Sequence, residues 1–293
     1  MKDLVAGYGH VIVDECHHIS AFSFEQVLKQ AKARFVVGLT ATPTRKDGHH
    51  PIIFLQCGPI RYHPSRNAPA GEELVQQVIP RHTEFRLPTT VQAIPEPSIQ
   101  DIFAALGKDP DRLGLIVGDV LNAVESGCFP LVLTGRREQV DQFEARLKER
   151  IKNVVILRGG MGRKQRQAVH EEMAGLPEGE PRVIVATGSC IGEGFDDAKL
   201  NTLFLAWPIS WKGTLQQYVG RLHRMHVNKK VVRVFDYVDS QVATLLRMFA
   251  KRVRGYKSLG YVIEEPAKTP AHKGPRNSVF ESGYDELTRG PDN

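Results

Sequence analysis

Short apolar runs alternate with helical apolar stripes over the second half of the chain. From about residue 130 these runs predict five strands, at Leu131–Thr134, Val154–Leu157, Val183–Ala186, Leu203–Ala206 and Val231–Val238. The segments between and after them have apolar residues at helical spacing and predict helices at 136–151, 163–174, 189–193, 212–225 and 240–253. Strands that alternate with helices build βαβ units around a mostly parallel sheet. We therefore predict an α/β fold for this region.

The first forty residues show the same alternation once. An apolar run at 10–13 precedes Asp14, residues 20–31 have helical spacing, and a second run at 34–39 precedes Thr40. After their first residues, His10 and Arg34, both runs are continuously apolar, which is typical of strands in a parallel sheet that is covered on both faces. We expect a strand, a helix and a second strand here.

The middle of the chain carries weaker patterns. Residues 44–75 predict little regular structure, and residues 75–87 fit a strand. Pro80 cannot donate a ladder hydrogen bond, so it restricts that strand to an edge position or a break. Prolines between residues 88 and 97 indicate a linker. Helices are expected at 98–106 and 110–126.

These patterns predict one partial domain, one complete domain and a tail. The expected bounds are 1–88 for the first domain, 89–115 for a linker, 116–255 for the second domain and 256–293 for a disordered tail rich in proline, glycine and charge. The two strands of the first domain are too few for a stable sheet of their own. The second domain has five strands with covering helices, so we expect it to fold alone.

Composition narrows the classes of protein that fit. The 293 residues allow about two domains, and 41% hydrophobic with 25% charged residues is ordinary for a globular chain. The net charge of +6 favours a polyanionic partner. Four cysteines without CxxC spacing argue against a disulfide scaffold or zinc ribbon and favour a reducing, cytoplasmic location. The sequence has no apolar run near the roughly 20 residues that span a bilayer.

Four blocks rich in polar and glycine residues lie at the ends of predicted strands or within predicted helices. They read DECH at 14–17, LTATP at 39–43, ATG at 186–188 leading to GEGFD at 192–196, and QYVGRLHR at 217–224. In this order they resemble motifs II, III, V and VI of superfamily 2 helicases and translocases. Residues 131–137 are weakly similar to motif IV. The resemblance covers about residues 1–255 and implies two RecA-like parallel sheets.

The resemblance also implies a role for each matching residue, with ATP and Mg²⁺ as cofactors and a nucleic acid, DNA rather than RNA, as partner. Asp14 would hold Mg²⁺ through water, and the expected catalytic residues are Glu15, Arg221 and Arg224. Further nucleotide contacts would come from Gly194, Asp196 and Gln217. Coupling between domains would involve His17, Thr40 and Thr42. Candidates for binding nucleic acid are Arg45, Arg136, Arg158, Arg163 and Thr187.

Each block also has a simpler interpretation. Asp14 and Glu15 alone would be two solvent-facing carboxylates at the end of a strand, and residues 217–224 alone would be a basic surface helix. Cys16 beside His17 and His18 resembles a metal site, but His17 matches a motif position that serves coupling, so we do not expect zinc. The co-occurrence of the four blocks in order favours the motor.

One motif of this family is absent from the 293 residues. Superfamily 2 motors bind ATP chiefly through a phosphate-binding loop, G-x-x-x-x-G-K-[ST], and no segment of this chain has that pattern. We therefore expect this chain alone to be inactive as an ATPase. It would be part of a helicase, or one half of a motor whose other polypeptide supplies the loop. The alternative is a non-catalytic module that binds nucleic acid or a partner through the second domain.

Overall fold

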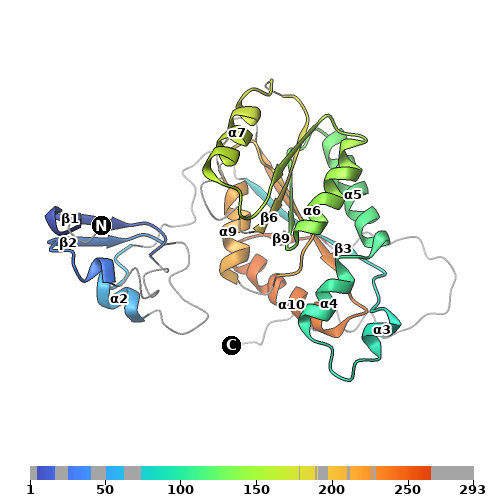
Figure 1. Cartoon of the computed structure of the whole chain (residues 1–293), viewed down its shortest axis with the longest axis horizontal. Helices are drawn as coiled ribbons and strands as arrows, with labels where there is room; N and C mark the ends of the chain where they lie inside the picture. Colours follow the sequence, from blue (N-terminus) through green and yellow to red (C-terminus); the bar gives the residue numbers. More distant parts are fainter. Residues whose placement is uncertain are drawn as a thin grey trace. The chain divides into compact units, whose positions relative to one another are not determined.

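The computed structural model describes residues 5–16, 26–40, 51–62, 74–177, 179–188, 190, 197–209, 212–224, 226 and 229–264 (Figure 1). They belong to two compact units, Met1–Gly71 and Glu72–Asn293. None of the helices in the described part of the chain has the length and apolar character that a membrane span needs.

The small unit is built on a two-stranded parallel sheet. Strand β1 (His10–Val13) pairs with β2 (Phe35–Gly38), after a short 3₁₀ helix η1 (Val5–Gly7). Helix α2 (Pro51–Cys57) buries Ile53 beside Cys16 in the core of this unit. Both predicted strands are present, whereas α2 lies in a region where no regular structure is predicted. Of the helix predicted at 20–31, the described residues 26–28 are helical.

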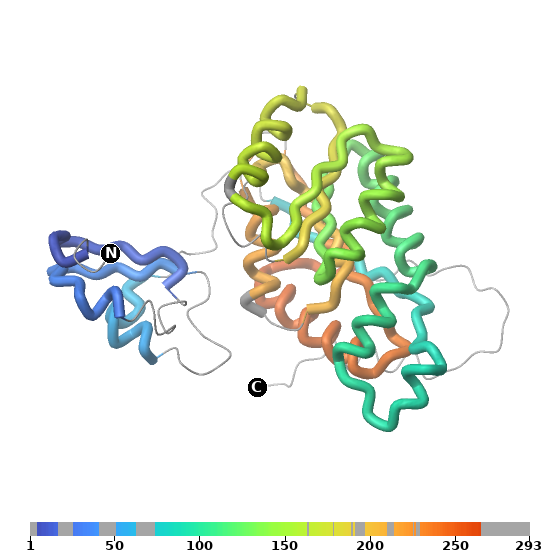
Figure 2. Tube along the Cα trace, in the orientation of Figure 1, coloured from blue at the N-terminus to red at the C-terminus, as the bar shows by residue number. Residues whose placement is uncertain are grey.

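The large unit has a seven-stranded sheet in the order β5-β6-β4-β7-β8-β3-β9, and its paired strands are parallel. Its strands are β3 (Val75–His82), β4 (Pro130–Thr134), β5 (Asn153–Leu157), β6 (Arg182–Thr187), β7 (Thr202–Leu205), β8 (Val231–Val238) and β9 (Val262–Ile263). Its helices are α3 (Thr89–Gln92), α4 (Ile99–Leu106), α5 (Pro110–Glu125), α6 (Arg137–Lys148), α7 (Arg163–Ala174), α9 (Lys212–Leu222) and α10 (Ala243–Ser258). The α/β fold is confirmed (Figure 2).

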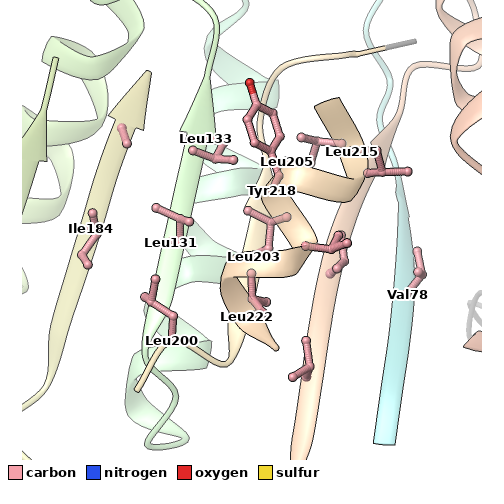
Figure 3. Packing of buried hydrophobic residues seen from close by; sticks show 14 of the residues in the cluster. Val78, Leu131, Leu133, Ile184, Leu200, Leu203, Leu205, Leu215, Tyr218 and Leu222 are labelled. Atoms are coloured by element: carbon pink, nitrogen blue, oxygen red, sulfur yellow. The ribbon is translucent and has the colours of Figure 1, made fainter. Parts of the chain in front are cut away.

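Helices cover both faces of this sheet. On one face, α5 and α6 pack Val120 and Phe143 against the strands. On the other face, α9 lies across β7 and β4, and Figure 3 shows Leu215, Tyr218 and Leu222 of this helix above the leucines of the strands. The long apolar runs of the sequence thus become strands that are buried on both sides. Because both faces of the sheet are covered, polar side chains gather in the loops at the amino and carboxyl ends of the strands.

The large unit begins earlier than the predicted boundary at residue 88. Strand β3 pairs with β8 along its whole length, so it belongs to the large sheet and not to the first domain. Pro80 is tolerated because β9 pairs only with Gln77 and Val78. The carbonyl of Val78 faces β9, because it accepts a hydrogen bond from the amide of Glu264. Backbone groups two residues apart on a strand face the same side, so the nitrogen of Pro80 also faces the β9 side, beyond the residues that β9 pairs with. The missing N–H of Pro80 therefore costs no ladder hydrogen bond.

The expected linker and tail also contribute to the large unit. The range 89–115 holds α3, α4 and the start of α5, and its Ile102 and Leu106 are buried against Leu245 of α10. The expected tail at 256–293 includes the last turn of α10 and β9, with Tyr256 and Tyr261 buried in the main core. Residues 265–293 lie outside the described part of the chain.

Three ion pairs connect these added segments to the rest of the large unit, and those of Arg112 and Arg252 are fully buried. Arg112 of α5 donates to Asp239 at 2.8 Å, and Arg81 of β3 pairs with Asp119 at 2.9 Å. Arg252 of α10 donates two hydrogen bonds of 2.8 Å to Asp236 of β8. Buried charges are tolerated when they are paired and hydrogen-bonded in this way. Sequence periodicity does not reveal such pairs, because a charged residue in a helical pattern predicts a solvent face.

Candidate nucleotide and nucleic-acid sites

Motif residues of the small unit meet at one edge of its sheet. Asp14 and Glu15 directly follow β1, and Leu39 and Thr40 directly follow β2. The backbone ties the two segments together, since the amide of Cys16 donates to the carbonyl of Leu39 and the amide of Leu39 donates to the carbonyl of Val13, each at 2.9 Å. The two motif segments are therefore neighbours at the carboxyl edge of parallel strands, which is the usual place for ligands.

Glu15 has an unusual backbone conformation. Its φ of 48° lies in the left-handed region, which non-glycine residues rarely adopt and which costs free energy. Its amide donates to Oδ1 of Asp14 at 2.9 Å. The side chain of Asp14 is exposed and that of Glu15 is half-buried. An exposed carboxylate beside a turn suits a hydrated Mg²⁺, which takes oxygen ligands and retains several waters.

Two cysteines pack beneath this turn. A Cβ atom at Gly38 would lie 2.9 Å from Sγ of Cys16 and 3.0 Å from Sγ of Cys57, so both sulfurs border the same glycine. Burial raises the pKa of the Cys16 thiol to about 11 and raises that of Cys57 as well. Both thiols are thus protonated at neutral pH. Among the described residues no group of three or more potential metal ligands is present.

A cavity of about 250 Å³ opens at the carboxyl edge of the large sheet. It lies where β4, β6 and β7 end, and its lining includes Thr134, Thr187, Gly188, Trp207 and Tyr218. Tyr218 comes from α9, and a Cβ atom at Gly188 would clash with its hydroxyl. The motif segment at 186–188 and the helix of the last motif are therefore brought together here.

Thr187 and the loop after β5 form a hydrogen-bonded unit beside this cavity. The amide of Gly159 donates to Oγ1 of Thr187 at 2.8 Å, and Nη2 of Arg137 donates to the carbonyl of Gly159 at 2.5 Å. Arg136 lies over the ring of Trp207 at 5.6 Å. A cation, hydroxyls and a fixed glycine loop at one edge fit the phosphate backbone of a nucleic acid.

Trp207 is a site residue that motif reasoning missed. Its indole meets Phe103 edge-on with ring centroids 4.8 Å apart, and it closes over Gly135. The flanking carbonyls of Ala206 and Ile209 accept hydrogen bonds from the buried Arg112 at 2.7 Å and Arg252 at 3.0 Å. The available signal was an aromatic residue directly after a buried strand.

Of two further arginine candidates for nucleic-acid contact, Arg158 is paired with carboxylates and the side chain of Arg163 is not described. Arg158 follows β5, but its Nη2 pairs with Asp141 and Glu144 of α6, each at 2.6 Å. These two carboxylates compete with any phosphate for that guanidinium. Arg163 begins α7, and its side chain is outside the described part of the structure.

The last motif forms the carboxyl-terminal half of α9 and the turn that follows. Gln217 and Arg221 lie on the helix, with Arg221 half-buried, and Arg224 is exposed just beyond its end. Nζ of Lys229 donates to the carbonyls of Leu222 and Arg224, at 3.0 and 2.8 Å. Such bonds satisfy helix-end carbonyls and fix the turn.

Five predicted site residues lie outside the described residues: His17, Thr42, Arg45, Gly194 and Asp196. Asp14, Glu15 and Thr40 belong to the small unit, and Gln217, Arg221 and Arg224 belong to the large one. The roles assigned to all of these residues in the sequence analysis stay predictions.

Known proteins resemble the chain in sequence and in fold. The family described as "Type III restriction enzyme, res subunit" matches residues 2–45. The putative ATP-dependent RNA helicase L396 of Acanthamoeba polyphaga mimivirus is 24% identical over 272 residues, which cover 90% of this chain and 49% of that protein. The probable helicase D10 of Escherichia phage T5 is 25% identical over 256 residues, covering 87% of this chain and 54% of that protein.

A solved structure shows the same fold. The structure of S. cerevisiae Dbp5 bound to RNA and ADP BeF₃ matches this chain with a TM-score of 0.55 and 14% sequence identity. The match covers 87% of this chain and 59% of the Dbp5 chain. The chain spans about half the length of the curated relatives it matches. With the motif blocks in order and helicase relatives over most of its length, the chain is a superfamily 2 helicase-like protein.

Proposed function

We propose that this chain is part of an ATP-dependent motor that moves along DNA, with the phosphate-binding loop supplied by another segment. The observation that carries the proposal is the set of four motif blocks in helicase order. Its described members at 14–16, 39–40 and 186–188 lie at the carboxyl ends of parallel strands. Those edges are where α/β proteins hold nucleotides and other ligands.

The nucleotide half of the proposal assigns a task to each of the following motif side chains. Asp14 holds hydrated Mg²⁺, which neutralises phosphate charge when bound, and Glu15 orients the attacking water or accepts its proton. Arg221 and Arg224 stabilise charge on the transferred phosphoryl group, and such an arginine contributes about 10³–10⁵ in rate. Further contacts to the nucleotide come from Gln217, Gly194 and Asp196.

The remaining motif residues are assigned to coupling between the two domains and to contact with the nucleic acid. His17, Thr40 and Thr42 link the nucleotide state to the second domain through hydrogen bonds. Thr187 and Arg136 at the carboxyl-edge cavity, with Arg45 and Arg163, contact the phosphate backbone, while Arg158 does so only if it leaves its two carboxylate partners. The restriction-enzyme family match favours DNA, and the mimivirus relative makes RNA the competing substrate to test.

Exposed apolar side chains of the small unit support the need for a further segment. Ile12 and Phe35 on its strands are 63% and 57% exposed, and Leu39 is 51% exposed. A parallel two-stranded sheet with such faces is not stable in water unless other elements cover it. We propose that the segment carrying the phosphate-binding loop provides this cover, either from the same protein or from a partner polypeptide.

A second candidate function is a non-catalytic module that binds nucleic acid or a partner. It is favoured by one observation: the large unit has its own continuous core and carries the carboxyl-edge cavity without help from the small unit. In this case DNA binding would persist in the absence of any ATP turnover.

ATP hydrolysis separates the two candidates. The full chain is assayed alone and after mixing with a polypeptide that carries a G-x-x-x-x-G-K-[ST] loop and is encoded directly upstream. Each assay is run without nucleic acid, with single-stranded DNA and with RNA. We expect background turnover for the chain alone and DNA-stimulated turnover for the mixture. Glu15→Gln and Arg221→Gln remove that turnover, whereas Lys251→Gln on the exposed face of α10 does not.

The alternative results are equally clear. Turnover by the chain alone that Glu15→Gln abolishes would contradict the need for a further segment. DNA binding with no turnover in the mixture favours the non-catalytic module. Stimulation by RNA and not by DNA overturns the choice of substrate. In every case, binding to the backbone falls steeply with salt, because it releases counterions from the phosphates.

A further inference from the structure

A second polar cavity lies at the opposite edge of the large sheet. It measures about 200 Å³ and is lined by residues from the loops that lead into β4, β6, β7 and β8. Phe129 precedes β4, Lys199 and Asn201 precede β7, and His226 and Lys229 precede β8. These strands are parallel neighbours, so the cavity lies at their amino edge. The five residues of β4, at about 3.3 Å each, put it about 16 Å from the carboxyl-edge cavity.

Asn201 is held in one orientation by hydrogen bonds to its side-chain oxygen. Its Oδ1 accepts a hydrogen bond from the amide of Phe129 at 2.9 Å and another from Oγ1 of Thr202 at 3.0 Å. Its backbone is paired as well, to Phe129 at 3.3 Å and to Arg233 at 2.9 Å. Because the backbone amide of Phe129 donates to Oδ1, that atom is the oxygen, and Nδ2 carries the two N–H donors of a side chain that lines the cavity.

Two lysines contribute positive charge to the cavity lining. Lys199 and Lys229 line the cavity together with His226, and none of the described residues lining it has a carboxylate. In the part of the chain that the structure describes, Lys199 has no carboxylate within ion-pair distance. A lining of donors and cations without carboxylates selects an anion.

Two acidic residues near this edge, among those that the structure describes, are bound to other partners. Asp197 is bound by Nη2 of Arg182 at 2.5 Å and by the backbone amide of Lys199 at 3.0 Å. Glu180 accepts from Nζ of Lys152 at 3.0 Å. Each of these two carboxylates therefore has an arginine or lysine partner outside the cavity lining.

We propose that this amino-edge cavity, with Lys199 and Asn201 as its main donors, binds a phosphate group. Its volume is below the roughly 300–1,000 Å³ of pockets that enclose a whole drug-sized ligand. It fits a single phosphate, either free or as one unit of a nucleic-acid backbone. Lys229 connects the cavity to the proposed nucleotide arginines, since it also binds the carbonyl of Arg224.

The site is tested by titrating inorganic phosphate into the full chain and measuring heat at constant ionic strength against chloride. We expect saturable binding that weakens about tenfold or more in Lys199→Gln and in Asn201→Asp, because each change removes a bond to a charged ligand. Asn201→Asp keeps an oxygen for Phe129 and Thr202 and places negative charge where the amide donors were. Lys251→Gln, which also removes one exposed charge, leaves the affinity unchanged.

Further arms identify the source of the phosphate and separate this site from the proposed nucleotide site. If Asn201→Asp weakens a short single-stranded DNA as much as it weakens phosphate, the ligand is the nucleic-acid backbone. If DNA binding is unchanged, the ligand is free phosphate. Absence of saturable binding, or equal binding by the wild type and both cavity variants, overturns the inference. So does binding that is lost in Arg221→Gln but kept in Asn201→Asp. None of these measurements depends on ATP turnover.

Discussion

At the scale of single residues, Gly135 packs closely against Trp207 at the carboxyl-edge cavity. A Cβ atom at Gly135 would lie 2.4 Å from Nε1 of the indole, and the ring is fixed by Phe103 and by the clamped carbonyls on both sides. We predict that Gly135→Ala lowers the free energy of unfolding by about 1–3 kcal/mol, the usual cost of overpacking. Urea unfolding followed by circular dichroism measures the loss, and tryptophan fluorescence reports the displaced ring.

Gly114 of α5 provides the matched control for that substitution. A Cβ atom there would meet no atom within 4 Å, and the residue lies in the interior of a helix. Gly114→Ala should therefore raise the free energy of unfolding by about 0.5–1 kcal/mol, because alanine loses less backbone entropy in a helix. Similar losses for both variants would contradict the packing argument.

A buried tyrosine predicts the response to alkaline pH. Burial raises the pKa of Tyr256 well above its ordinary value, and the charge of Asp236, to which its hydroxyl donates at 2.9 Å, raises it further. The folded protein thus binds this proton more tightly than the unfolded chain. The resulting stability is complete below about pH 10 and is lost as the pH rises above it, by about 1.4 kcal/mol per pH unit for one group.

Tyr256→Phe tests this origin of the pH dependence. The variant loses a hydrogen bond, at a cost of about 1 kcal/mol at pH 8, but should fall less steeply between pH 10 and 11 than the wild type. Urea midpoints across that range give both quantities. An unchanged alkaline slope would show that other groups dominate, of which Tyr237 is the first to examine, since burial also raises its pKa.

At the scale of elements, apolar runs were sufficient where packing alone decides the structure. The strand predicted at 231–238 matches β8, and the helix predicted at 163–174 matches α7, because their patterns follow directly from burial. The position of β3 next to β8 was not predictable, because pairing in a sheet depends on distant residues. The motif spacing located Asp14, Thr187 and Arg221, whereas Trp207 and the cavity at Asn201 depend on contacts that no local pattern records.

The attachment of α10 to β8 gives a prediction at this scale. Arg252 and Asp236 are fully buried partners, and Arg252 also holds the carbonyl of Ile209. Arg252→Met leaves a buried carboxylate with Tyr256 as its remaining partner, and should cost about 3–5 kcal/mol. Adding Asp236→Asn should recover part of that loss because it removes the uncompensated charge. Thermal unfolding of the two variants and of Asp236→Asn alone completes the cycle, and simple additivity would contradict the coupling.

At the scale of the whole molecule, the large unit is a folding unit that extends beyond residues 116–255 on both sides. Its first strand, β3, contributes Arg81, which pairs with Asp119, and α5 contributes Arg112, which pairs with Asp239. On the other side, Tyr256 donates to Asp236 and Tyr261 is packed in the core with its hydroxyl 2.9 Å from Nε2 of His223. A fragment cut at 116 and 255 would leave Asp119 and Asp239 without these arginines and would uncover β8.

We therefore predict that residues 74–264 form a soluble domain that unfolds in one cooperative transition, while residues 116–255 do not. Unpaired buried carboxylates cost several kcal/mol each, which is comparable to the total stability of a domain. Thermal melts by circular dichroism and hydrogen exchange of the two fragments make the comparison. A fragment 74–115 added in trans should restore order to 116–264 if β3 and the first turn of α5, with Arg112, are what the 116–264 piece lacks. Cooperative unfolding of 116–255 at the same temperature as 74–264 would show that β3, β9 and their ion pairs add nothing to the fold.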